Sequence, residues 1–239
     1  MKTVRTHDKI YLFESRHDKP KEYFKFIEKK AFGKKRYFNK KEIICDFGCA
    51  TGEFLSFLKK KHPEKNFIGA DVRSDLLKRA KKIVPDLTFL KKSVLNTRAF
   101  PKNKFDKCFL LGVHPIFDDF EKCFSNLVLW GKPKGKIFIY DLFNPYPVDV
   151  LIKFRFSKDY KKGPYKKNWN IFSQESVSKF LKKNKSIKKF QFEEFEMPFD
   201  LKPKKDPARS WTIKSNKKRL TTNGLSIIQR QILLSIYLK

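Results

Sequence analysis

The chain has 239 residues and a formal net charge of +31, with 56 Lys and Arg against 25 Asp and Glu. Hydrophobic residues make up 40% of it, which excludes an intrinsically disordered chain, and no run approaches the ~18 apolar residues of a membrane span. The charged N-terminus, Met1–Leu12, has no signal-peptide core, so we expect a cytoplasmic protein with no membrane partner.

The high positive charge has two interpretations. Basic proteins often bind nucleic acids or other anions. Most of the cations here are Lys, whereas nucleic-acid sites favour Arg, and they are spread along the whole chain beside 26 Phe. Because Lys and Phe both have AT-rich codons, genome composition also explains the excess. We expect an anionic small molecule as the partner, with RNA as the alternative; the sequence does not indicate the oligomeric state.

The regular part of the chain follows a polar N-terminal cap segment, residues 1–41. Within that segment, apolar residues at helical spacing predict a short helix at Pro20–Lys30. Strands are then predicted at Glu42–Phe47, Asn66–Asp71, Leu87–Leu90, Phe105–Gly112 and Lys136–Leu142. Between them, helices are predicted at Glu53–His62, after an N-cap at Ser74, and from Asp119 to the stop signals Gly131 and Pro133.

The second half of the chain is less regular. Ser173 can cap a further helix, the segment around Phe192 predicts a sixth strand, and the apolar run Leu225–Leu238 predicts a seventh. A polar excursion, Pro198–Gly224, separates these two strands.

Alternating strands and helices predict an α/β fold: a doubly wound, mostly parallel seven-stranded sheet with helices on both faces. We expect one domain over 1–239, with a cofactor-binding core at 42–144 and a substrate-side half with lid insertions at 145–239. The four Cys form no C-x-x-C pair, so we expect buried thiols and no metal site.

The most informative segment is Ile43–Phe54, in which an apolar strand ends at Asp46 and a small-residue turn leads into a helix. Gly48 and Gly52 let the backbone pass close to a ligand, and the helix behind them offers unpaired N–H groups. With Cys49 and Ala50 between the glycines, this strand–turn–helix unit predicts a nucleotide cradle at the carboxyl end of the first strand.

A second acid lies at the end of the second strand. Asp71, followed by Val72, comes 23 residues after Gly48. A carboxylate at this point can accept hydrogen bonds from both hydroxyls of a ribose. The alternative is that Asp71 only begins a turn or caps the next helix; the order and spacing of the two elements favour the ribose.

These residues resemble the class I S-adenosylmethionine-dependent methyltransferases, over about Glu42–Leu142 and more loosely to the C-terminus. Asp46–Gly52 fits the first motif of that family, with Ala50 in place of its middle glycine. The resemblance implies that the last strand inserts antiparallel and that S-adenosylmethionine, rather than a nicotinamide cofactor, is bound. It also implies cofactor contacts after the third strand at Ser93 and Val94, where the family usually has an acid, and after the fourth at Leu111 and Gly112.

The resemblance further implies that His114 faces the methyl-transfer centre. An imidazole titrates near neutral pH, so His114 is the candidate general base; the alternative is a structural histidine before Pro115. For the acceptor, Arg209 and Trp211 in the polar excursion are the candidate substrate residues, because Arg can clamp a carboxylate or phosphate.

Three functions are therefore compared. The leading one is methyl transfer to a small, acidic biosynthetic metabolite at oxygen or nitrogen. The second is methylation of ribosomal or transfer RNA, and the third is a non-catalytic methyltransferase-like subunit, against which the intact cofactor motif argues.

Overall fold

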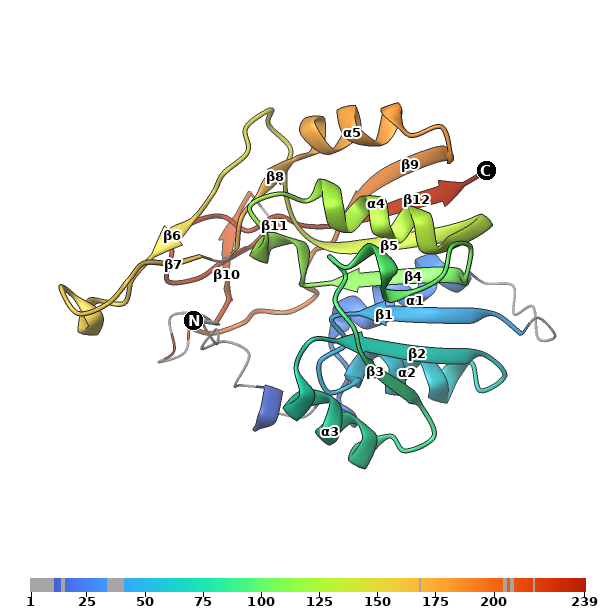
Figure 1. The fold of residues 1–239 in the computed structure, drawn as a ribbon. Coiled ribbons are helices and arrows are strands. Elements are labelled where there is room, and N and C mark those ends of the chain that lie inside the picture. Colours follow the sequence, from blue (N-terminus) through green and yellow to red (C-terminus); the bar gives the residue numbers. More distant parts are fainter. Residues whose placement is uncertain are drawn as a thin grey trace.

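A twisted sheet forms the centre of the computed structural model, which describes residues 11–13, 16–33, 41–167, 169–203, 206, 209–216 and 218–239. The strand order is β3-β2-β1-β4-β5-β12-β9, and the short strand β8 pairs with the end of β5 (Figure 1). Neighbours from β3 to β5 are parallel, whereas β12 is antiparallel to both β5 and β9. The predicted sheet, including its antiparallel last strand, is confirmed.

The elements keep the chain order expected from the sequence. The sheet strands are β1 Ile43–Phe47, β2 Asn66–Asp71, β3 Thr88–Lys91, β4 Phe105–Leu111, β5 Gly131–Asn144, β8 Phe172–Ser173, β9 Ile187–Glu194 and β12 Gln231–Leu238. The helices are α1 Glu22–Phe32, α2 Glu53–Lys61, α3 Ser74–Ile83, α4 Glu121–Trp130 and α5 Gln174–Lys183. Short 3-10 turns are η2 Thr97–Ala99, η3 His114–Ile116 and η4 Ser157–Asp159.

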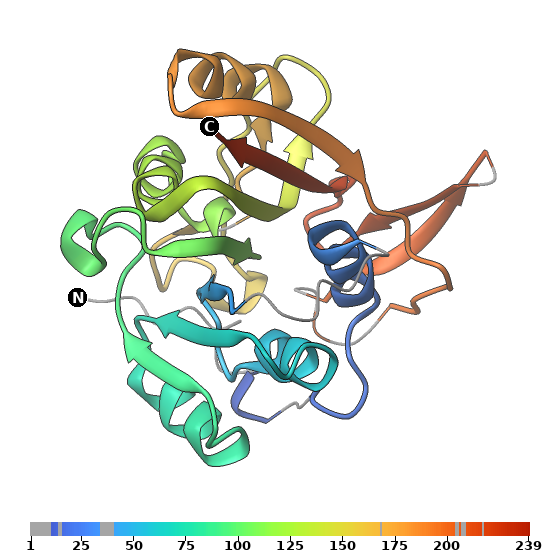
Figure 2. The same cartoon turned by 90° about the vertical axis from the view of Figure 1, so that its right-hand side faces the viewer.

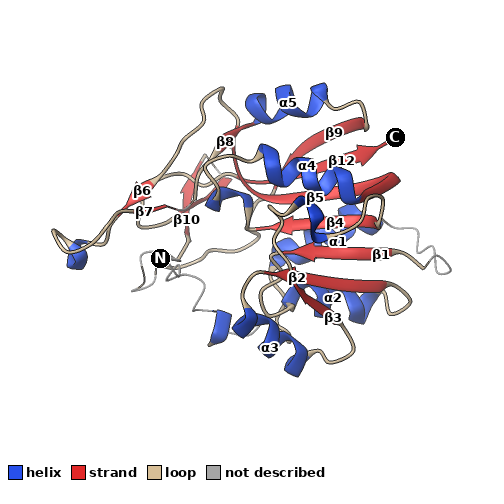
Figure 3. Ribbon diagram, viewed as in Figure 1, coloured by secondary structure: helices blue, strands red, loops and turns tan. Residues whose placement is uncertain are grey.

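Two hydrophobic clusters lie on opposite faces of the sheet, which gives the three layers seen in Figure 2 and, by element type, in Figure 3. One cluster joins α1, α2 and α3 to side chains such as Ile44, Phe109 and Phe138. The other joins α4 and α5 to the alternate residues, such as Cys108 and Ile139. Because successive strand residues point to opposite faces, continuous apolar strands supply both clusters, as buried parallel strands require.

Helix α1 docks on the central strands. Ile27 is fully buried, and the Tyr23 ring stacks on Tyr140 of β5 with centroids 4.5 Å apart. This contact places the segment before α1 at the same end of the sheet as the carboxyl ends of β1, β2 and β4.

The second half contains two small pairs of strands beyond the main sheet. Strands β6, Lys153–Phe154, and β7, Lys166–Lys167, pair at the base of residues 153–167, here called the basic arm. Strands β10, Trp211–Ser215, and β11, Lys218–Thr222, form an antiparallel hairpin inside the polar excursion. Figure 1 shows the basic arm projecting away from the sheet.

Several predicted boundaries differ from the structure. Strand β5 begins at Gly131, directly after α4, and β12 begins at Gln231 rather than Leu225 because the preceding residues form a loop joined by the Thr221–Gln229 bridge. Ser74 is the first helical residue of α3 and not its N-cap, whereas Ser173 caps α5 by accepting the Ser176 N–H at 2.9 Å. The four thiols are free and buried.

Candidate active site

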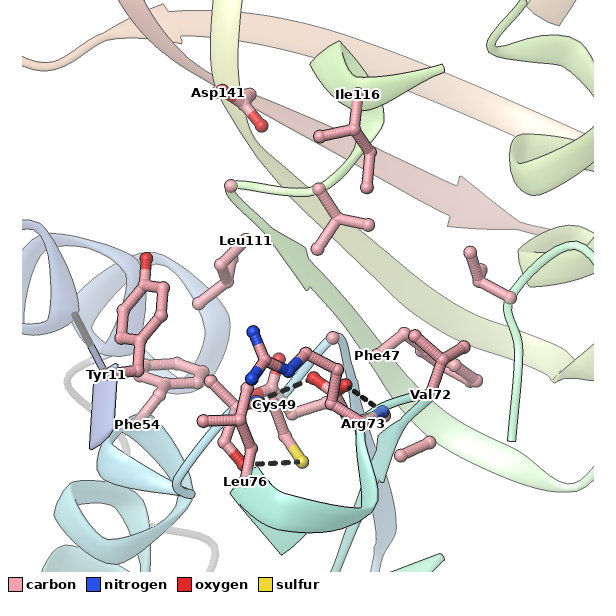
Figure 4. A pocket seen from close by; sticks show the side chains of 18 of the residues that line it. Tyr11, Phe47, Cys49, Phe54, Val72, Arg73, Leu76, Leu111, Ile116 and Asp141 are labelled. Atoms are coloured by element: carbon pink, nitrogen blue, oxygen red, sulfur yellow. Dashed lines mark hydrogen bonds between the residues drawn. The ribbon is translucent and has the colours of Figure 1, made fainter. Parts of the chain in front are cut away.

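A cavity of about 290 Å³ opens at the carboxyl ends of β1, β2 and β4 (Figure 4). This is the position at which doubly wound sheets bind ligands. Its floor is the turn between β1 and α2, and its walls come from the segments that follow β2, β3 and β4 and from Asp141 near the end of β5. Residues from the N-terminal segment, which contacts the start of α2, complete the lining together with Trp169.

The β1–α2 turn is held against β2 by backbone hydrogen bonds. The N–H groups of Gly48 and Cys49 both donate to the carbonyl of Ala70, at 2.7 and 3.2 Å. Ala50, which replaces the family's middle glycine, has a φ of 48°, in the left-handed region that disfavours a Cβ. The turn therefore keeps the glycine-type backbone path although an alanine stands at its centre.

Asp71 fixes this turn from the neighbouring strand. One carboxylate oxygen accepts the Ala50 N–H at 3.0 Å and the other accepts the Arg73 N–H at 2.9 Å. Asp71 is only 8% exposed, and it lines the cavity. Asp71 thus stabilises the turn, as the structural interpretation of the sequence expected, and its place in the cavity lining also allows it to bind a ribose.

Asp46 is the second buried acid of the floor. Burial, and then the nearby Asp71 carboxylate, raises the pKa of Asp46 well above its usual range. A cationic ligand between these two acids would relieve that repulsion. The floor is therefore suited to a positively charged group.

The expected cofactor residues come together in this one cavity. All of them line it except Gly52, which instead starts α2 with a φ of 75° and packs beside Phe89. The Ser93 hydroxyl accepts the Leu95 N–H. Leu111 lines the cavity and is drawn beside Tyr11 in Figure 4. A Cβ on Gly112, whose φ is 73°, would meet nothing within 4 Å, so the backbone there has open space in front of it.

The structure places His114 behind the cavity rather than in it. Its side chain is fully buried, and its ring stacks on Phe143 with centroids 4.7 Å apart. Its neighbours Val113 and Pro115 line the cavity, but His114 does not. Burial lowers the pKa of His114 to about 3, so the imidazole is neutral at physiological pH. This position does not suit direct contact with a methyl acceptor.

Arg209 and Trp211 are also outside the cavity lining. Trp211 begins β10 and pairs with Thr222 of β11, and Arg209 lies just before it with its N–H donating to the Asp206 carbonyl. The aromatic residue of the second half that does reach the cavity is Trp169. Its neighbour Asn170 is buried and ties the segment to Pro115, whose carbonyl accepts the Asn170 N–H at 2.9 Å.

Sequence reasoning missed the lining residues Tyr11, Lys21, Tyr23 and Asp141. Asp141 had a signal, because an acid near the end of a buried strand is the pattern that marked Asp46 and Asp71. The other three had none: they lie far along the chain from the motif, and only the docking of α1 brings them to the cavity.

Two other kinds of site were sought in the part of the chain that the structure describes. No group of three or more His, Cys, Asp or Glu there is arranged to hold a metal ion. No described helix is long and apolar enough to cross a membrane.

Comparison with known proteins agrees with this geometry. A family of methyltransferase domains matches residues 44–135. A tRNA (guanine-N(7)-)-methyltransferase of Brevibacillus brevis is 30% identical over 29% of this chain and 37% of its own length. A trans-aconitate 2-methyltransferase of Afipia carboxidovorans is 35% identical over 21% of this chain and 20% of its own. The chain thus spans less than half the length of these curated relatives.

Solved structures extend the similarity in fold to most of the chain. The YcgJ protein of Bacillus subtilis superposes with a TM-score of 0.59 and 14% identity, covering 90% of this chain and 97% of that one. The matched residues 44–135 include the strand–turn–helix floor and the acids of β1 and β2. Residues 44–135 thus match a methyltransferase domain, and the sheet as a whole shares the fold of the YcgJ structure.

Proposed function

We propose that this protein transfers a methyl group from S-adenosylmethionine to a small metabolite that carries an anionic group. The observation that supports an acceptor of this kind is the set of residues that line the cavity in addition to the expected cofactor residues. These include Tyr11, Lys21 and Trp169, which would contact an acceptor bound beside the cofactor. The Lys21 ammonium is a cation in this lining; it lies 5.4 Å from the centre of the Tyr11 ring and 3.5 Å from the Glu53 carboxylate.

The cofactor residues fit S-adenosylmethionine by their chemistry. Asp71 would hold the ribose hydroxyls, the segment Ser93–Val94 would border the adenine, and the β1–α2 turn with Gly112 would accept the amino-acid part. When bound, the cofactor supplies a sulfonium methyl group that is already activated for displacement. The protein's own task is alignment and the exclusion of water.

The second half of the chain supplies the water-excluding wall. The buried Asn170 side chain donates to the Phe117 carbonyl at 2.8 Å and accepts the Ile152 N–H at 2.8 Å. These bonds join three loop segments and hold Trp169 over the cavity next to Ile116 and Phe117. We propose that the whole chain acts as one domain, because α1 and this wall both complete the cavity, and that its four free thiols suit a reducing cytoplasm.

The distribution of Lys favours a small acceptor over RNA. Many exposed Lys residues lie at the ends of α2, α3 and α5, on β9 and around the start of β5, at elements or ends that do not line the cavity. Others lie near it, at Lys92 and on the basic arm. An RNA-binding surface would instead concentrate its cations around the site.

RNA remains a second candidate for a specific reason. A tRNA-methylating relative matches 29% of the chain. The basic arm beside Trp169 also carries Arg155, whose guanidinium lies 5.2 and 4.9 Å from the ring centres of Tyr160 and Tyr165. Tyr160 and Tyr165 are 62% and 59% exposed, as base-stacking residues would be.

Two measurements test the proposal. Calorimetry should show S-adenosylmethionine binding with micromolar affinity and NAD binding far more weakly. Then the purified protein is incubated with S-adenosyl-[methyl-14C]methionine and a cell extract of the source organism, separated into small molecules and RNA. Label in an anionic small molecule supports the first candidate. Label in the RNA fraction replaces it with the second, and label in neither favours the non-catalytic subunit.

A further inference from the structure

Asp141 stands out among the cavity residues because the cofactor fit does not require it. It lies near the end of β5, and Figure 4 shows its side chain on the side of the cavity opposite the cofactor turn, near Ile116. The side chain is only 11% exposed. Tyr140, the residue before it, is already committed: its hydroxyl donates to the Gln231 side-chain carbonyl at 2.5 Å.

The two carboxylate oxygens of Asp141 have different surroundings. Oδ1 accepts the Leu142 N–H at 3.0 Å. Oδ2 is buried and has no hydrogen-bond partner in the described part of the protein. The atom it faces is Nδ1 of His114, 3.6 Å away, which is just beyond hydrogen-bonding distance.

His114 matches this arrangement from the other side. Both of its ring nitrogens are buried, and neither meets the distance and angle of a hydrogen bond with a described residue, although the Leu142 backbone is close enough to raise the pKa of the imidazole. The ring is held by Phe143, Phe124 and Phe172, with centroids 4.7 to 6.0 Å away. Leaving buried polar groups unpaired costs about 1–3 kcal/mol each, so an opposed pair of this kind needs an explanation other than folding stability.

The electrostatics of the pair follow from burial. Burial raises the pKa of Asp141 to about 8, although the backbone N–H groups of Leu142 and Val113 favour its ionised form. Burial also lowers the pKa of His114 to about 3. The other titratable group beside Asp141 on its own strand is Tyr140, whose pKa burial also raises. On the adjoining strands, its neighbours are uncharged: Ile232, which pairs with it, and the nearby Gln231 and Leu111. The other titratable residues that line the cavity near it include Tyr11, Lys21 and Tyr23.

We propose that Asp141 is the proton acceptor in methyl transfer and that the neutral His114, facing its buried oxygen, is the residue that positions it. This inference rests on the proposed methyl transfer, but not on the identity of the acceptor. It gives His114 the role of a positioning residue, acting through Asp141.

The step balances in atoms and charge. A lone pair on the acceptor's oxygen or nitrogen forms a bond to the methyl carbon, and the carbon–sulfur bond breaks with its electrons remaining on sulfur. The proton of the acceptor passes to Oδ1 of Asp141, because Oδ2 is buried against His114. The positive charge of the sulfonium and the negative charge of the carboxylate both disappear, so the buried site ends neutral.

His114 sets how readily the carboxylate forms. In the tautomer that carries the ring proton on Nδ1, a small closure of the 3.6 Å gap to Oδ2 makes a hydrogen bond that favours the ionised form of Asp141. An acceptor pKa near the working pH is the condition under which a general base is most effective.

The first experiment needs no acceptor. Protein labelled with 13C at the aspartate carboxyl carbons is titrated by NMR, and Asp141→Asn assigns the signal. We expect a midpoint near pH 8, rising by about one unit in His114→Leu and returning in His114→Asn, which restores a hydrogen-bonding group. A midpoint near 4, or one that His114→Leu leaves unmoved, overturns the inference.

The second experiment uses the methyl-labelling assay with the small-molecule and RNA fractions of the extract. Asp141→Asn should lose about a hundredfold or more of the labelling rate while still binding S-adenosylhomocysteine in calorimetry. Asp71→Asn is the matched control, since it should lose cofactor affinity instead. Full labelling by Asp141→Asn overturns the inference, whereas no labelling by the wild-type protein overturns the proposed function and leaves the titration to judge Asp141.

Discussion

The cofactor side and the acceptor side of the cavity are built in different ways. On the cofactor side, consecutive parallel strands end beside one another, and backbone groups such as the Ala70 carbonyl fix the turn. On the acceptor side, residues from α1, η3 and the segment around Trp169 meet through side-chain contacts between distant parts of the chain. A local sequence motif can therefore predict the cofactor, whereas the shape of the acceptor site depends on contacts between distant parts of the chain.

The largest effect should come from Asn170, which tests whether the acceptor side depends on one side chain. Asn170→Ala leaves the Ile152 N–H and the Phe117 carbonyl without their partner, so the free energy of unfolding should fall by about 2–4 kcal/mol in chemical denaturation. Cofactor affinity, measured by calorimetry, should change less than threefold where the protein is folded. Asn144→Ala is the control, because that asparagine makes its bonds at the surface. An equal loss in both variants would contradict the role given to Asn170.

Asp71 tests the cofactor side. Asp71→Ala should weaken S-adenosylmethionine binding by about 1–3 kcal/mol, or roughly tenfold or more, because ribose hydroxyls lose their acceptor. The melting temperature should also fall, since the Ala50 and Arg73 N–H groups lose theirs. The control Asp75→Ala removes an exposed carboxylate that pairs with Arg73 and should change affinity little. Unchanged affinity in Asp71→Ala would leave that residue with only its structural task.

Asp141 links the two sides through pH. Its raised pKa means that the unfolded chain ionises above about pH 4 while the folded protein retains the proton up to about pH 8. Wild-type stability should therefore fall across that window as the pH rises. Asp141→Asn should raise the melting temperature by several degrees at pH 8 and by little at pH 4, measured by calorimetric scans. A gain that does not vary with pH would show that Asp141 does not titrate in this window.

The smallest effect should come from Ala50. At its positive φ, glycine is unstrained, so Ala50→Gly should raise the free energy of unfolding by at most about 1 kcal/mol after the greater entropy of the unfolded chain is counted. Ala80→Gly in the middle of α3 should instead be destabilising by about the same amount or more. Destabilisation of both variants would mean that Ala50 contributes contacts that outweigh its backbone strain.

Particular residues show where sequence-based prediction works and where it ends. The strands of the sheet and all but one of the expected cofactor residues follow from apolar runs and from a motif whose geometry is local. The β10–β11 hairpin and the pairing of the basic arm were not predicted, because those segments are short, exposed and rich in Lys, and so carry no hydrophobic period.

The acceptor side shows the physical limit more clearly. His114 was expected in the site from its place after the fourth strand, yet the turn of η3 directs it into an aromatic cluster and leaves Val113 and Pro115 on the cavity. Arg209 and Trp211 were chosen for their chemistry, whereas their position depends on how β10 pairs with β11. Such directions are decided by tertiary packing and not by spacing.

Strand β12 has a consequence for how the molecule is made. It lies between β5 and β9 and pairs with both, yet it is built from residues 231–238, so most of one edge of β5 stays unpaired until those residues have been synthesised. At translation rates of about 5–20 residues per second, that interval is on the order of 5–20 s. An apolar strand edge exposed for so long can pair with other nascent chains. Chaperone capacity during synthesis, rather than final stability, should therefore limit the yield of this protein in a foreign host.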